Sequence, residues 1–299
     1  MNPNFSRFNG LPGILAGTAA VAVMVVSQPA SAKTAREVAQ VAVPTTVQIN
    51  NLLQADRSGS GVIIARNGNT YTVLTANHVV KNPNSEFVIR TSKGNEHPVT
   101  GVQGFPGGEG SPDLAIATFE SEEEYAVAPI SDSDQATIGS GVYISGYPLP
   151  AVGSTEREYA FTNGQVTNRR SNHPEGYTLR YDAVTRRGMS GGPVFDVSGR
   201  VVGIHGQGDT VGTVRSEVGG GAEEVKTGLN SAIPINTFMG MLSQVEMNSS
   251  LLQLDDSVPD DVDAEDVAQS DVNSWFDEFA FNVGVGIIER VLPFPRLPF

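Results

Sequence analysis

Apolar side chains recur in short runs between Val41 and Phe238, and glycine, proline, asparagine and aspartate separate these runs. In the first half the clearest runs lie at 61–65, 71–75, 86–90 and 114–119. In the second half they lie at 142–145, 165–167, 177–181, 193–195, 201–204 and 229–233. Valine, isoleucine, threonine and tyrosine dominate them, and short runs of such residues between turn formers indicate β-strands. The pattern predicts an all-β fold whose strands fall into two halves.

An acidic, turn-rich stretch at 120–139 separates the two sets of strands. Its composition is typical of an exposed connection. We therefore expect a first barrel with an N-terminal extension at 33–125 and a second barrel at 126–250. Pro234 follows the last strand and is expected to open a C-terminal helix through Val245, with Asn236 as its N-cap.

The first 32 residues have the features of a secretory signal. Arg7 precedes an apolar run at 11–26, and Ala-Ser-Ala at 30–32 is the small-residue pattern after which signal peptidases cut. The run is short for a membrane span of roughly 20 residues, although an uncleaved anchor is the alternative. We expect a bacterial protein that is secreted or periplasmic.

The last segment, 251–299, is expected to be an acidic linker with a short tail. Residues 255–271 carry eight carboxylates and no basic side chain, so charge repulsion opposes compaction. Aromatic and aliphatic residues between Trp275 and Ile288 then have the spacing of a short amphipathic helix. This tail docks back on the body, contacts a partner or a membrane surface, or stays disordered; the sequence leaves these alternatives open.

Composition narrows the chemistry further. Glycine accounts for 33 of the 299 residues, more than the roughly 7% usual in proteins, which favours a turn-rich fold. The absence of cysteine excludes disulfides and thiol catalysis. None of the four histidines stands at ligand spacing to another, so we expect no metal and no cofactor. A net charge of −14 repels phosphate backbones and argues against nucleic-acid partners.

The segment 188–193, Gly-Met-Ser-Gly-Gly-Pro, places Ser190 in a glycine-rich loop between apolar strands. Glycine permits the turns that aim main-chain N–H groups at one point. We expect the amides of Gly188 and Ser190 to form an oxyanion hole for a tetrahedral intermediate. A glycine-rich β-turn with an incidental serine is the alternative.

Two other segments supply the partners that a serine nucleophile needs. His78 directly follows a predicted strand, and a neutral imidazole there can accept the proton of Ser190. Asp113 stands at the head of the strand at 114–119, where a carboxylate can orient the imidazole. Taken singly, either residue could be structural. Together they predict a catalytic triad of His78, Asp113 and Ser190.

These motifs, Thr75-Ala-Asn-His78, Asp113-Leu-Ala and Gly188-Met-Ser-Gly-Gly-Pro193, resemble in their order those of the chymotrypsin-like (trypsin-like) serine peptidases. The resemblance covers residues 45–245. It implies two six-stranded antiparallel β-barrels with the catalytic cleft between them, and hydrolysis of protein or peptide substrates through an acyl-enzyme.

Residues near the nucleophile resemble the glutamyl endopeptidase branch of this family. Tyr-Asp-Ala-Val-Thr at 181–185 and Gly-Ile-His at 203–205 imply that Thr185 and His205 line a specificity pocket. The resemblance implies a preference for Glu or Asp before the scissile bond. Arg186 and Arg187 depart from that branch, in which small residues stand there, and an apolar specificity is the alternative.

The opening strand at 59–64 and Asn-His-Val-Val at 77–80 resemble the Do-like periplasmic quality-control peptidases. Those proteins carry peptide-binding modules after the peptidase, and the residues from Gly240 to Phe299 are too few for one. We therefore expect a monomer rather than a caged assembly. A non-catalytic binding or quality-control protein on a peptidase scaffold is the alternative function.

Overall fold

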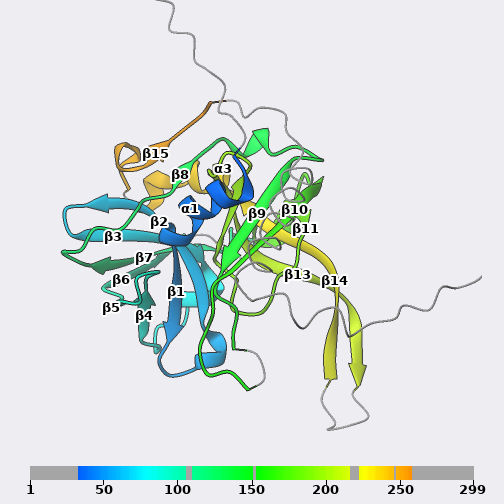
Figure 1. Ribbon diagram of the computed structural model, residues 1–299, viewed down its shortest axis with the longest axis horizontal. Coiled ribbons are helices and arrows are strands. Elements are labelled where there is room, and N and C mark those ends of the chain that lie inside the picture. The colour runs from blue at the N-terminus through cyan, green and yellow to red at the C-terminus, as the bar shows by residue number, and fades with distance from the viewer. Residues whose placement is uncertain (1–32, 106–109, 151–152, 216–221, 246, 258–299) are drawn as a thin grey trace, which may run out of the picture.

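The computed structural model describes residues 33–105, 110–150, 153–215, 222–245 and 247–257, which form two curled β-sheets with few helices (Figure 1). The expected signal segment at 1–32 lies outside the described residues. So do the expected amphipathic segment and most of the acidic linker, at 258–299. In the described ranges, no helix is long and apolar enough to span a membrane.

A helix that the sequence analysis did not predict, α1 (Ala35–Thr45), precedes the first strand. It begins with a capping box: the Thr34 hydroxyl accepts a hydrogen bond from the Glu37 N–H, and the Glu37 carboxylate accepts one from the Thr34 N–H. Val38 and Ala42 on its inner face are fully buried in the apolar core. Threonine followed by glutamate three residues later is the sequence signal that indicates this helix start.

The first sheet holds seven antiparallel strands in the order β5-β4-β1-β2-β3-β7-β6. Its strands are β1 (Thr46–Asn51), β2 (Gly59–Asn67), β3 (Thr70–Ala76), β4 (Phe87–Arg90), β5 (Glu96–Pro98), β6 (Gly101–Gly104) and β7 (Leu114–Glu120). The edge strands β5 and β6 are joined by Val99 and Thr100, whose N–H groups donate to Phe87 on one side and Thr118 on the other. The sheet is therefore a curled half-barrel whose two edge strands follow one another in the chain without pairing with each other.

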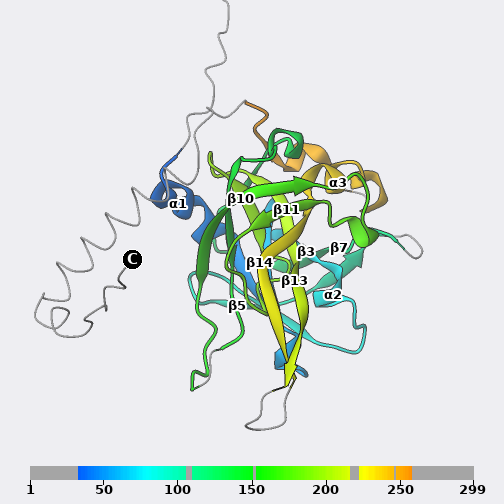
Figure 2. The same cartoon turned by 90° about the vertical axis from the view of Figure 1, so that its right-hand side faces the viewer.

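The second sheet has the order β12-β9-β10-β11-β14-β13-β8-β15. Its strands are β8 (Pro129–Ile130), β9 (Gly141–Gly146), β10 (Ala160–Arg169), β11 (Leu179–Asp182), β12 (Pro193–Asp196), β13 (Val201–Arg215), β14 (Ala222–Pro234) and β15 (Gln253–Leu254). Because β12 pairs with both β9 and β13, six of these strands close into a barrel. The chymotrypsin-like all-β arrangement of two barrels expected from the sequence is confirmed. Beyond the barrel, β13 and β14 continue as a long ribbon (Figure 2).

The C-terminal helix is shorter than expected. Helix α3 (Ile235–Met239) is followed by a separate 3₁₀ turn at Leu242–Val245. Gly240, a weak helix former, stands at the break. The N-cap is Pro234 rather than Asn236, whose side chain instead donates to Asp132 and accepts from the Ser133 N–H.

The connection at 120–139 and the start of the last segment are packed more closely than their acidity indicated. Tyr125 of the connection packs in the core of the first sheet, and β8 joins the second sheet. Ala128 and Ile130 are buried. Strand β15 pairs with β8, which lies beside β13. The fully buried Arg200 pairs with Asp196 and reaches Asp255 and Ser257, so the chain up to residue 257 packs against the barrel.

Candidate active site

His78 and Asp113 meet because the ends of β3 and β7 are antiparallel neighbours, with Ala76 opposite Leu114. His78 lies on the short helix α2 (Asn77–Val80), which directly follows β3. Its Nδ1 is 2.5 Å from Asp113 Oδ2, and its main-chain N–H donates to Asp113 Oδ1 at 2.7 Å. Both carboxylate oxygens therefore hold His78. With Nδ1 engaged in this way, the ring is oriented with Nε2 as the nitrogen left for chemistry.

A second side chain holds the carboxylate from the other barrel. The Tyr177 hydroxyl donates to Asp113 Oδ2 at 2.7 Å, and both residues are buried. Burial acts to raise the pKa of Asp113, but the hydrogen bonds from His78 and Tyr177 and the charge of His78 outweigh it, and the pKa lies below its ordinary value. Asp113 is therefore ionised at neutral pH.

Ser190 is fixed at the contact between the two barrels. Its carbonyl accepts from the Ser60 N–H at 2.8 Å, and the next N–H, that of Gly191, donates to the His205 carbonyl at 2.7 Å. Gly191 has φ +86°, and a Cβ there would lie 2.1 Å from Thr75 Oγ1, so only glycine fits. The loop thus rests directly on β2, β3 and β13.

The Ser190 hydroxyl donates to the Gly206 carbonyl at 3.2 Å. Gly206 in turn contacts Tyr177, because an ideal Cβ at Gly206 would lie 2.0 Å from the tyrosine oxygen. Ser190, Gly206, Tyr177, Asp113 and His78 therefore form one continuous set of contacts. The structure brings the three residues of the expected triad to the same place, with the serine hydroxyl turned to a carbonyl.

Among the N–H groups of residues 188–192, those of Gly188 and Ser190 have no acceptor in the part of the chain that the structure describes. The carbonyls of the same two peptide units are engaged. Arg187 O accepts from the Leu149 N–H and Met189 O from the Gly192 N–H, at 2.8 and 2.9 Å. A pair of unsatisfied N–H groups beside a serine is the arrangement that binds a developing oxyanion.

His205 lies inside the second barrel with 3% of its surface exposed. Its Nδ1 is 2.7 Å from the Tyr181 hydroxyl. Burial lowers its pKa to about 3; the charges of His78 and Lys226 act in the same direction, and a hydrogen bond with the Ser231 main chain opposes them. The imidazole is therefore neutral at pH 7.

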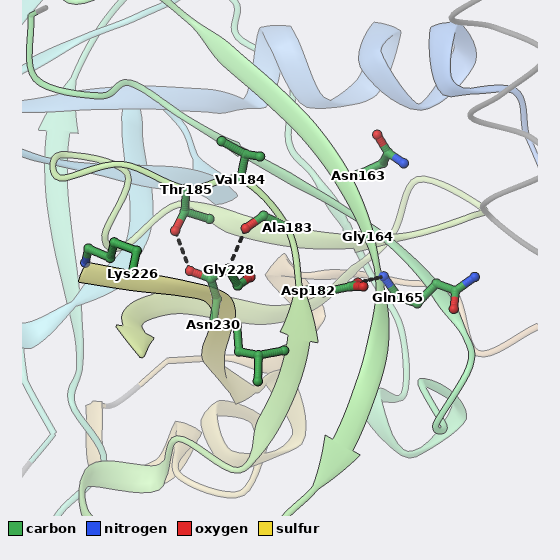
Figure 3. Close-up of a pocket in the computed structure, with 11 residues that line it drawn as sticks. Asn163, Gly164, Gln165, Asp182, Ala183, Val184, Thr185, Lys226, Gly228 and Asn230 are labelled. Carbon is green, nitrogen blue, oxygen red and sulfur yellow. Dashed lines mark hydrogen bonds between the residues drawn. The ribbon is translucent and has the colours of Figure 1, made fainter. Parts of the chain in front are cut away.

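Thr185 lines a cavity of about 600 Å³ in the second barrel (Figure 3). Its hydroxyl donates to Asn230 Oδ1. Lys226 and Val184 also face this cavity. His205 is not among the residues that line this cavity.

Sequence reasoning missed two polar side chains that support the site. Tyr177 begins a run whose pattern indicates only a β-strand, and no neighbouring residue in the sequence indicates the contact with Asp113. Arg157 lies in an irregular stretch between β9 and β10 that carries no recognisable motif. Within the described part of the chain, no cluster of three or more His, Cys, Asp or Glu side chains could hold a metal ion.

Comparison with known proteins gives related sequences. Residues 59–204 match the profile of the trypsin-like peptidase domain. The serine protease Do-like HtrA of Lactococcus lactis subsp. cremoris is 31% identical over 210 residues, which are 68% of this chain and 48% of that protein. The serine endoprotease DegS of Haemophilus influenzae is 26% identical over 208 residues, 70% of this chain and 56% of that protein.

A probable periplasmic serine endoprotease, DegP-like, from Rhizobium meliloti is 29% identical over 153 residues, which are 51% of this chain and 28% of that protein. The chain thus spans about half the length, or less, of most of the curated relatives it matches.

Proposed function

Because residues 59–204 of this chain belong to the trypsin-like peptidase family, we propose that the protein is a serine endopeptidase acting on protein or peptide substrates. The observation that carries the proposal is the contact of His78 with an ionised Asp113 beside the loop of Ser190: one carboxylate oxygen holds the imidazole and the other holds the His78 main-chain N–H. The relatives named above are of the Do-like type, and the glutamyl endopeptidase branch stays a prediction.

In the proposed reaction, the Ser190 hydroxyl turns from the Gly206 carbonyl toward His78 Nε2 when substrate fills the cleft. Such a bond is often absent in a free enzyme and forms in the substrate complex. Ser190 Oγ attacks the peptide carbonyl while His78 takes its proton, and Asp113 stabilises the resulting imidazolium. The N–H groups of Gly188 and Ser190 donate to the oxyanion of the tetrahedral intermediate.

His78 then gives the proton to the leaving amine, which breaks the C–N bond and leaves an acyl-enzyme on Ser190. Water attacks the ester carbonyl, His78 takes the water proton, and the second tetrahedral intermediate collapses with return of that proton to Ser190. The cycle uses only groups of this chain and water.

The decisive experiment compares wild type, Ser190→Ala and Ser154→Ala with a fluorophosphonate probe and with casein as substrate. We expect labelling and cleavage in wild type and Ser154→Ala, and neither in Ser190→Ala, with unchanged thermal unfolding. Folded wild-type protein that neither labels nor cleaves would establish the alternative, a binding protein on a peptidase scaffold.

For specificity, we propose a preference for Glu or Asp before the scissile bond, with Thr185 and His205 as substrate-binding residues. Support comes from Lys226, which lines the same cavity as Thr185 and forms no ion pair with an acidic side chain of the described residues. His205 is neutral and offers hydrogen bonds rather than charge. Exposed Val184, in the same cavity, supports the rival apolar preference.

Cleavage of a peptide library tests the specificity, with wild type, Lys226→Met and Lys81→Met as the control lysine. Acidic residues before the cut in wild type and a selective loss of them in Lys226→Met support the proposal. A profile dominated by leucine and phenylalanine overturns it and leaves the catalytic assignment untouched.

We also propose that the protein is exported, as a monomer, to the periplasm or the cell exterior. The signal-like pattern at 1–32 and the periplasmic names of several relatives support this. N-terminal sequencing of the mature protein is expected to begin near Lys33, and its recovery in the cytoplasm with an intact N-terminus contradicts the proposal.

A further inference from the structure

Arg157, in the loop between β9 and β10, reaches across the contact between the two barrels. Its Nη1 donates to Asn50 Oδ1 at 2.8 Å. Its Nη2 lies within hydrogen-bond distance of three main-chain carbonyls, those of Gly59 at 2.8 Å, Gly188 at 3.0 Å and Tyr147. One side chain thus joins the first barrel, the second barrel and the loop that carries Ser190.

No acidic side chain among the described residues pairs with this guanidinium. Burial lowers the pKa of Arg157 to about 10, so it remains charged at neutral pH. A partly buried charge without a counter-charge is costly unless it makes many hydrogen bonds. Here main-chain carbonyls provide those bonds, and the carbonyls in turn are held at fixed positions.

The Gly188 carbonyl is held twice, by Arg157 and by the Ser60 hydroxyl at 2.8 Å. The same Ser60 oxygen accepts from the Tyr147 N–H at 2.8 Å, and the Tyr147 carbonyl accepts from Arg157. These contacts form a closed network around the Gly188 carbonyl.

The network bears directly on the two free N–H groups. A peptide unit is planar, so a carbonyl fixed on one side fixes its N–H on the other. The Arg187 carbonyl, bonded to Leu149, orients the N–H of Gly188, and the Met189 carbonyl, bonded to Gly192, orients the N–H of Ser190. The Gly188 carbonyl lies between these two peptide units. Gly188 has φ +94°, and rotation of its backbone would turn the Gly188 N–H away from the position that it shares with the Ser190 N–H.

We propose that Arg157 is a positioning residue that holds the Gly188–Ser190 loop in the conformation in which both N–H groups face the oxyanion. The proposal rests on the proposed peptidase function. Arg157 does not touch the substrate and acts through the Gly188 carbonyl.

The test compares Arg157→Met and Arg157→Lys with Arg169→Met. Arg169 is a matched control, because it also lies partly buried in the second barrel and donates to two main-chain carbonyls, those of Ser133 and Ala136, away from the loop. We expect kcat to fall about 10²-fold in Arg157→Met with KM unchanged, because loss of an oxyanion donor costs about 10²–10³ in kcat. Arg157→Lys keeps the charge but not the planar fork, so its kcat is expected to lie between those of wild type and Arg157→Met.

Two further measurements separate positioning from general stability. A peptide boronate, which places an oxygen in the oxyanion hole, should bind Arg157→Met about 10²-fold more weakly, while the cleaved product peptide binds unchanged. Guanidinium ion at low concentration should restore part of the activity of Arg157→Ala and none in Arg169→Ala. Wild-type kcat in Arg157→Lys and Arg157→Met, or equal losses in Arg157→Met and Arg169→Met, would overturn the proposal.

If Arg157→Met does not fold, the test is made with Arg157→Lys, in which kcat is again expected to fall while KM stays unchanged. If wild type itself fails to label at Ser190, the peptidase function fails, and the positioning role is judged by amide hydrogen exchange. Faster exchange at residues 189–192 in Arg157→Lys than in Arg169→Met supports the role, and equal exchange refutes it.

Discussion

The hydroxyl of Tyr177 occupies the space that a side chain at position 206 would need: a Cβ on Gly206 would lie 2.0 Å from the tyrosine oxygen. The same hydroxyl donates to Asp113, while the Gly206 carbonyl accepts from Ser190. Tyr177 and Gly206 therefore form the physical link between the carboxylate of one barrel and the nucleophile of the other.

Tyr177→Phe removes one donor from Asp113. Because that hydrogen bond lowers the pKa of Asp113, its loss raises the pKa. The folded protein then favours the ionised carboxylate less strongly, so the loss of stability as the pH falls below about 3.9 becomes smaller than in wild type. Stability should fall by about 1.5–3 kcal/mol, the usual value of a hydrogen bond to a charged group. An unchanged dependence of stability on pH in urea unfolding would show that Tyr177 only fills space.

Gly206→Ala brings a methyl group against the Tyr177 ring and hydroxyl. Overpacking of this kind costs about 1–3 kcal/mol, and the displaced tyrosine releases Asp113, so activity should fall with stability. Gly240→Ala is the matched control: its Cβ would meet the Asn236 carbonyl at 3.4 Å, an ordinary van der Waals contact away from the triad. Urea unfolding and casein hydrolysis measure both variants, and equal effects at the two glycines contradict the assignment.

The sequence was sufficient to predict the two-barrel fold because its strands are short, β-branched and punctuated by turn formers. It also marked Ser190, His78 and Asp113, each of which stands at the end of such a run. It could not indicate Tyr177 or Arg157, since their partners, Asp113 and Gly188, are distant in the chain and only the closed barrels bring them together. The helix α1 was missed although its capping box is local.

The expectation that Thr185 and His205 line one specificity pocket came from a resemblance, and it stays a prediction. Thr185 faces a cavity, whereas His205 points into the barrel toward Tyr181. The burial of His205 depends on the packing of β11, β13 and β14 around it, which no local pattern encodes.

Asp196→Ala is expected to destabilise the protein far more than Asp134→Ala. Asp196 Oδ2 accepts a hydrogen bond from Arg200 Nε at 2.8 Å and forms an ion pair with Nη2 at 2.6 Å, and the arginine side chain is 1% exposed. Removal of one partner leaves a buried charge and costs about 3–5 kcal/mol. Asp134 pairs with Arg169 from a side chain that is 74% exposed, where such pairs contribute at most about 1 kcal/mol. Urea unfolding of the two variants provides the comparison, and similar losses would contradict the buried role of Arg200.

The buried imidazole of His205 makes stability depend on pH in a defined window. Its pKa falls from 6.5 in the unfolded chain to about 3 in the folded protein, mainly through burial. Between these two pH values the unfolded state therefore binds a proton that the folded state does not bind. The free energy of unfolding therefore decreases as the pH falls below 6.5, by up to about 1.4 kcal/mol per pH unit. His205→Gln lacks this titration, and between pH 7 and 4.5 it should lose about 2–3 kcal/mol less than wild type does. Asp113 does not interfere, because its lowered pKa affects stability only near and below the ordinary value of about 3.9 for aspartate. Urea unfolding at several pH values measures both slopes, and a His205→Gln slope equal to that of wild type would mean that His205 is not buried as a neutral ring.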